Sequence, residues 1–398
     1  MTLLPLETLL VATLVLLLGR WVNRQIPLLS HYNIPDPITG GLLFAVGMLI
    51  SGELSSFSLE FDSTLKPVLL LAFFAAVGLS ANLSLLKQGG KRLLMFVLVL
   101  IPFLLLQNLT GLLIAWGLDM HPLMGLIGGS ITLVGGHGTG AAYAERFAEV
   151  NNIQSIMELA MTGATLGLVL GGICGGPLAQ WLIKRHQLAG SDGQAAATYI
   201  SSDATEAAPI KAGNLIPVLA AVLIAVLAGS WLANLVSGGP VTLPSFLWCL
   251  LLGVAIRNGG HLIGLRFNDA AIDMLSSLTL ALFLAITMMA LNLASVASLA
   301  GPLLLILLGQ LLVVLIYGGL LVYRAVGRDY ESAVMSAAFC GFAMGATATA
   351  IANMQAITQK YGPAPQAFLV VPLVGAFLID LLNALVLTGY LSLPWVGG

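Results

Sequence analysis

The stretch RLLMFVLVLIPFLLLQNLTGLLIAWG, residues 92–117, decides the fold class, because only its first residue is charged. A helix needs about 20 apolar residues to cross the roughly 30 Å hydrocarbon core of a bilayer. The stretch is long enough for that crossing, so it predicts a transmembrane helix. Similar apolar runs, separated by short polar clusters, fill most of the chain.

The composition supports the same class. Of the 398 residues, 59% are hydrophobic and 8% are charged, whereas a soluble domain has about 45–50% apolar and about 25% charged residues. The net charge of −2 provides no basic surface for nucleic acid. The three cysteines form no CxxC or Cys/His spacing and are interpreted as apolar packing residues. The chain is predicted to be an all-α membrane protein.

Polar clusters divide the chain into predicted spans. Ten transmembrane helices are expected, near residues 6–22, 36–52, 66–86, 92–117, 156–183, 212–236, 242–257, 273–293, 301–325 and 365–392. Two further stretches, 122–150 and 331–360, are rich in Gly, Ala, Ser and Thr and are too interrupted for one clean crossing. They are predicted to be re-entrant hairpins, because irregular backbone at membrane depth must be buried or line a water-filled cavity.

The basic residues predict the orientation. If the N-terminus is outside and each hairpin returns to its side of entry, only Lys66 and Arg146 of the 15 basic residues fall outside, in agreement with the positive-inside rule. Both termini are therefore predicted to be outside. The polar stretch 187–209 has too few aliphatic and aromatic residues to order itself and is predicted to be a cytoplasmic linker.

An internal repeat connects the two halves. A shift of 210 positions places Ala81-Asn82-Leu83 on Leu291-Asn292-Leu293, and a shift of 205 positions, five fewer, places GHGTGAA (136–142) on GFAMGAT (341–347). The predicted domains are a first repeat at 1–186, the linker at 187–209 and a second repeat at 210–398. Five spans per repeat, an odd number, make the repeats inverted, as in many secondary transporters. Chance similarity between apolar segments is the alternative.

The glycine run of the first hairpin is a candidate anion site. Glycine permits positive φ and close approach of the backbone to a ligand, and the start of the next helix offers free N–H groups and a positive dipole end. Close helix packing is the alternative for the glycines, and His137 either binds a carboxylate or holds the turn. The candidate substrate-binding residues here are Ser130, Thr132, Gly135, Gly136, His137, Gly138, Thr139 and Gly140.

The second hairpin and the last span add further candidates. Gly345, Ala346 and Thr347 form a second N–H-rich tip, and hydroxyl and amide oxygens suit Na⁺, with helix capping as the alternative. Asp380 lies in the last span, where a carboxylate is costly and marks a pathway or a partner; Asn383 lies on the same helical face. The candidate Na⁺ ligands are Thr349, Asn353, Gln355 and, more weakly, the symmetry mates Asn82 and Asn292.

Three motifs resemble the bacterial sodium/glutamate symporter family. They are GGHGTGAA (135–142), GATATAIANMQAIT (345–358) and AFLVVPLVGAFLIDLLNALV (367–386). The likeness extends to LLLGR (16–20), LAFFAAVGLSAN (71–82), PLMGLIGGSITL (122–133) and GLVLGGICGGP (167–177), so it covers nearly the whole chain. Ala348 stands where the family pattern has a proline, which puts the geometry of that turn in doubt but not its role.

The resemblance implies a function. It implies Na⁺-driven uptake of L-glutamate by an inner-membrane homodimer, with both termini periplasmic, hairpin tips that meet at the site and an elevator-like motion of a transport unit against a scaffold. No cofactor is expected besides Na⁺ as the coupling ion. The sequence contains no HExxH, GxSxG or phosphate-loop motif, so no enzyme is predicted. The alternative is a Na⁺- or H⁺-coupled carrier of another small carboxylate.

Overall fold

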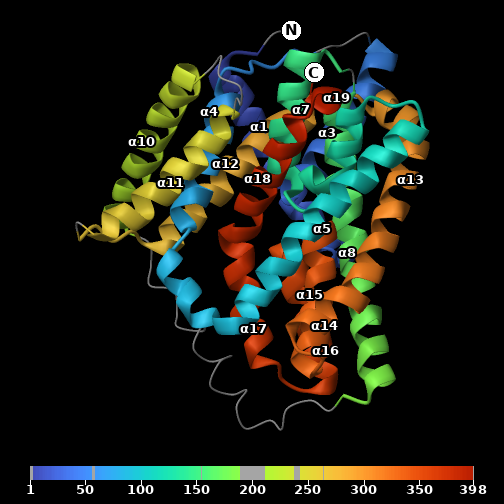
Figure 1. Cartoon of the computed structure of the whole chain (residues 1–398). Coiled ribbons are helices and arrows are strands. Elements are labelled where there is room, and N and C mark those ends of the chain that lie inside the picture. Colours follow the sequence, from blue (N-terminus) through green and yellow to red (C-terminus); the bar gives the residue numbers. More distant parts are fainter. Residues whose placement is uncertain are drawn as a thin grey trace. The chain divides into compact units, whose positions relative to one another are not determined.

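The computed structural model describes residues 3–55, 59–153, 155–188, 211–236, 243–262 and 264–397. Every regular element in these ranges is a helix, and no β-strand is present there (Figure 1). The predicted all-helical class is therefore confirmed. The predicted linker 187–209 lies almost entirely outside the described residues.

Each of the ten predicted spans corresponds to helical structure. The helices are α1 (Pro5–Gln25), α3 (Asp36–Ser55), α4 (Leu65–Ser80), α5 (Gly90–Gly117), α8 (Ile156–His186), α10 (Ala212–Val236), α11 (Ser245–Leu262), α12 (Asp269–Met289), α13 (Leu293–Tyr317) and α17 (Pro365–Leu373). The π-turn η3 (Gly318–Val322) leads from α13 to α14 (Tyr323–Val326), and η4 (Val374–Leu378) leads from α17 to α18 (Ile379–Leu391). Among the described residues, six helices are long and apolar enough to cross a membrane, which supports an integral membrane protein.

Short helices fill the remaining connections. They are α2 (Pro27–His31), η1 (Leu83–Gly89) and α19 (Pro394–Gly397). The predicted span 66–86 is shorter than expected, because α4 ends at Ser80 and the chain continues in the 3₁₀ helix η1.

Both predicted hairpins are broken helices. The first consists of α6 (Pro122–Leu126), the π-turn η2 (Ile127–Ile131) and, after a break, α7 (Gly136–Asn151). The second consists of α15 (Tyr330–Met344) and α16 (Thr347–Tyr361), which pack side by side (Figure 1). Glycine occurs at both breaks, because helical backbone is interrupted there at little steric cost.

The chain forms two compact units, and each takes segments from both halves of the sequence. Unit 1 comprises Met1–Asn82, Ala144–Glu158 and Ile210–Leu299. Unit 2 comprises Leu83–Tyr143, Leu159–Pro209 and Ala300–Gly398. The boundary between the units falls inside α7, α8 and α13, so the compact units differ from the two sequence repeats.

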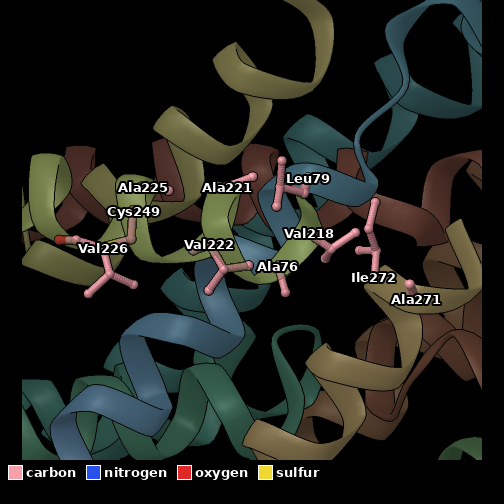
Figure 2. Packing of buried hydrophobic residues seen from close by; sticks show 11 residues of the cluster. Ala76, Leu79, Val218, Ala221, Val222, Ala225, Val226, Cys249, Ala271 and Ile272 are labelled. Carbon is pink, nitrogen blue, oxygen red and sulfur yellow. The ribbon is translucent and has the colours of Figure 1, made fainter. Parts of the chain in front are cut away.

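Small and branched side chains form the core of unit 1. Figure 2 shows this core, in which residues of α4, α10, α11 and α12 pack together, including Ala76, Val222, Cys249 and Ile272. A Cβ on Gly78 would lie 2.1 Å from the carbonyl oxygen of Leu250, so α4 and α11 are in backbone contact there. Such small-residue contacts are the usual basis of helix packing in lipid, where apolar burial provides little driving force between helices.

Candidate substrate and ion site

The two hairpin tips lie next to each other in unit 2. Gly136 has φ +65° and begins α7, and a Cβ placed on it would lie 3.8 Å from the carbonyl oxygen of Gly345. The first N–H groups of a helix have no acceptor inside the helix, so the starts of α7 and α16 bring free donors to this point. The structure thus brings together Gly135–Gly140 and Gly345–Thr347, the two predicted anion-binding runs.

Ser130 lies at the centre of a buried polar cluster. Its backbone N–H donates to Asn108 Oδ1 at 3.0 Å, and Asn108 Nδ2 lies 2.8 Å from its hydroxyl. The Ser130 hydroxyl lies 2.5 Å from Asn383 Oδ1, and Asn383 Nδ2 donates to the Ser130 carbonyl at 3.0 Å. All three side chains are at most 1% exposed. The predicted residues Ser130 and Asn383 therefore meet, and they bind each other through their side chains.

Two buried glutamines each donate a hydrogen bond to the hairpin from the other half of the sequence. Gln107 on α5 donates to the carbonyl of Ala343 at 2.6 Å, close to the tip of the second hairpin. Gln310 on α13 donates to the carbonyls of Gly128, at 3.3 Å, and of Gln107, at 2.9 Å. A helix from the first half of the sequence thus supports the hairpin of the second half, and a helix from the second half supports the hairpin of the first.

Thr132 and His137 make different contacts within the first hairpin. The Thr132 hydroxyl donates to the carbonyl of Ile127 at 2.6 Å, across the π-turn η2. This bond closes the turn with the hydroxyl hydrogen, and the oxygen keeps its acceptor lone pairs. His137 lies in the first turn of α7, and its Nε2 is 3.0 Å from the Thr165 hydroxyl on α8. Gly138, Thr139 and Gly140 continue the same first turns of α7.

The second hairpin is attached to the last span at a π-turn. The Thr347 hydroxyl donates to the carbonyl of Gly375, inside η4, at 3.0 Å. Because a π-turn leaves backbone groups out of the regular helical ladder, such turns often occur at functional sites. Asp380 lies in the first turn of α18, two residues after η4, and is half-buried. Its carboxylate makes no hydrogen bond or ion pair with any residue that the structure describes.

The predicted Na⁺ ligands fall into two groups. Thr349 is 1% exposed, and its hydroxyl has no hydrogen-bond partner in the described ranges. Asn353 Nδ2 donates to the carbonyls of Gly171 and Ala337 at 2.9 and 3.2 Å, whereas Gln355 is exposed. Asn82 and Asn292 belong to unit 1 and Thr349, Asn353 and Gln355 to unit 2.

Comparison with known proteins agrees with this arrangement. A model of the sodium/glutamate symporter family matches residues 1–363. The chain belongs to the sodium/glutamate symporter family. It is 42% identical over 389 residues to a sodium/glutamate symporter of Haemophilus influenzae, with 96% of this chain and 95% of that protein covered. It is 43% identical over 397 residues to a sodium/glutamate symporter of Escherichia coli K12, with 99% and 98% covered.

Membership of this symporter family confirms the expected class, a transporter and not an enzyme. Among solved structures, the sodium proton antiporter MjNhaP1 from Methanocaldococcus jannaschii aligns over 99% of both chains, at 15% identity and a TM-score of 0.41. That score is too low to support any argument about this symporter family member.

Sequence reasoning missed four polar residues of this symporter family member. Gln107 and Asn108 lie side by side in an otherwise apolar run, and Gln310 is similarly isolated in α13, whereas Thr165 is one of two threonines close together in α8. Polar side chains inside a span are rare because they cost free energy in lipid. This signal was present in the sequence and identifies the three amides, but not Thr165, because threonine is common at helix contacts in membranes. No group of three or more His, Cys, Asp or Glu side chains suited to a metal occurs in the described residues.

Proposed function

We propose that this chain is a secondary active transporter that couples Na⁺ entry to uptake of L-glutamate by alternating access. The observation that carries the proposal is the 42–43% identity, over nearly the full length, to proteins named sodium/glutamate symporters. The geometry of unit 2 is consistent with it, because two N–H-rich tips meet beside a buried polar cluster.

The substrate is proposed to bind at the meeting point of the hairpin tips. Glutamate carries two carboxylates, and the two helix starts, α7 and α16, each offer free N–H groups and a positive dipole end. The ammonium group needs an acceptor. Asp380 is the carboxylate nearest in sequence to the π-turn that holds Thr347, and it has no described partner.

Na⁺ is proposed to bind through neutral oxygen atoms in unit 2. Hard cations prefer oxygen ligands, and the buried oxygens that lack a hydrogen-bond partner in the described ranges include Thr349 Oγ1, Gln107 Oε1 and Gln310 Oε1. A buried acceptor without a partner is costly, so these atoms are the first candidates to face an ion. Gln355, Asn82 and Asn292 are weaker candidates, because Gln355 is exposed and the two asparagines belong to unit 1.

The wider architecture is also a proposal. Ten spans and two re-entrant hairpins would form two inverted repeats, at 1–186 and 210–398, in an inner-membrane homodimer with both termini periplasmic. Unit 2 contains the candidate substrate residues, which supports its assignment as the moving part and that of unit 1 as the scaffold of an elevator-like transporter.

The test is uptake of labelled L-glutamate into proteoliposomes with and without an inward Na⁺ gradient. Each net charge that moves across 100 mV is worth about 2.3 kcal/mol, so glutamate, which carries −1, gains from an inside-negative potential only if at least two Na⁺ accompany it. We expect accumulation that requires Na⁺ and rises with that potential. Uptake that does not depend on the Na⁺ gradient would overturn the proposal. Uptake that does not depend on the membrane potential would mean that fewer than two Na⁺ accompany each glutamate.

A further inference from the structure

The contact between His137 and Thr165 locates a proton at the first hairpin. The Thr165 hydroxyl lies 2.8 Å from the carbonyl oxygen of Met161, one turn earlier on α8, and 3.0 Å from His137 Nε2. A carbonyl oxygen only accepts, and a hydroxyl has one hydrogen to donate. The shorter contact takes that hydrogen, which is the common back-bond of threonine in a helix.

This assignment fixes the state of the imidazole. Because the Thr165 hydrogen is directed at Met161, the bond to His137 requires a hydrogen on Nε2. His137 is 7% exposed and forms no ion pair with the described residues. A charged imidazolium is costly in such a position, so the ring is neutral and its Nδ1 is a bare acceptor. Nδ1 makes no hydrogen bond within the described parts of the chain.

The substrate ammonium group has three N–H donors and needs acceptors in addition to Asp380. Helix starts provide N–H donors, which suit the substrate carboxylates, but an ammonium group needs an acceptor. We propose that Thr165 is a positioning residue that holds His137 in the Nε2–H form, so that Nδ1 accepts a hydrogen bond from the substrate ammonium and selects amino acids over amine-free dicarboxylates. This inference rests on the proposed function, because it assumes that glutamate binds at the tips.

Competition in proteoliposomes tests the inference. Labelled L-glutamate uptake is inhibited with unlabelled L-glutamate or with glutarate, which has the same two carboxylates and no amine. Thr165→Val should weaken the apparent affinity for glutamate about tenfold or more, the value of one hydrogen bond to a charged group, and leave inhibition by glutarate unchanged. Thr165→Ser, which keeps the hydroxyl, should restore glutamate affinity. Thr162→Val is the matched control on α8, because Thr162 is buried to a similar degree as Thr165 but makes no hydrogen bond to His137.

Two outcomes overturn the inference. Equal loss for glutamate and glutarate in Thr165→Val would mean that Thr165 is only structural, and no loss would mean that it has no role. If wild type shows no Na⁺-dependent glutamate uptake, the proposed function fails and the ammonium assignment fails with it.

The ring state is measured independently of transport. In reconstituted wild type labelled with ¹⁵N-histidine, the imidazole signals are recorded by solid-state NMR, and the signal of His137 among the five histidines is identified by its loss in His137→Gln. An unprotonated Nδ1 and a protonated Nε2 are expected. A protonated Nδ1 would overturn the inference even if Thr165→Val does not fold.

Discussion

Replacing Ser130 with alanine tests the buried polar cluster. The change removes the only donor to Asn383 Oδ1 in the described ranges and the acceptor of Asn108 Nδ2, but keeps both backbone bonds of residue 130. A stranded buried polar atom costs about 1–3 kcal/mol inside proteins, while hydrogen bonds between helices in lipid average about 0.6 kcal/mol. For two stranded atoms, these values give a loss in the free energy of unfolding of about 1–6 kcal/mol. Because the cluster is completely buried, we expect a loss of about 2–3 kcal/mol.

A double-mutant cycle measures this cost. The free energy of unfolding is determined by SDS titration in mixed micelles for wild type, Ser130→Ala, Asn383→Ala and the double variant. Removing Asn383 also removes the stranded oxygen, so the double variant should lose at least about 1 kcal/mol less than the sum of the single losses. Thr110→Val, which removes an exposed hydroxyl on α5, should cost little. Single costs that add within about 0.5 kcal/mol would refute the cluster as described.

Three further predictions concern the tips, the last span and the base of the second hairpin. Gly167→Ala should lower glutamate uptake about tenfold or more, because its Cβ would lie 2.5 Å from a carbonyl oxygen at the second tip, whereas Gly176→Ala on the same helix has open space and should leave uptake unchanged. Asp380→Asn should raise the KM for glutamate about tenfold without changing inhibition by glutarate; equal effects on both would contradict its role toward the ammonium. Asp329 caps the start of α15 and pairs with Arg92. Burial alone would raise the pKa of Asp329, but hydrogen bonds from Arg92 and from the start of α15 outweigh it and lower that pKa. Because the folded pKa is the lower one, the ion pair stabilises the protein above the unfolded aspartate pKa of about 3.9, and this contribution is lost as pH falls through the folded value. Asp329→Asn should therefore cost less than about 1 kcal/mol at pH 7, since the side chain is 44% exposed, and the difference in the free energy of unfolding from wild type should shrink in acid.

The sequence was sufficient to predict the helices and the two breaks. Lipid leaves the backbone no partner but its own helix, so an uncharged run such as 92–117 has one available structure, and α5 covers it. The glycines at 135–140 and 345 predicted interruptions, with close helix packing as the alternative, and both breaks occur there.

The choice of partners could not be predicted in the same way. Ser130 and Asn383 were named as candidate substrate residues, but their bonds to each other and to Asn108 were not predicted. A period of 3.6 residues tells which face of a helix a side chain lies on, but not which distant helix it meets. The compact units could not be predicted from the sequence either, because each is assembled from segments of both halves.

The crosswise support of the hairpins has a consequence for biosynthesis. The first tip needs Gln310 and Asn383, which follow their partners by 182 and 253 positions. When ribosomes have completed only the first half of the chain, Gly128 and Ser130 have been made, but Gln310 and Asn383 have not. The bonds of the first tip to these amides therefore form only after α13 and α18 have been made, so a chain that stops earlier leaves this tip incompletely bonded.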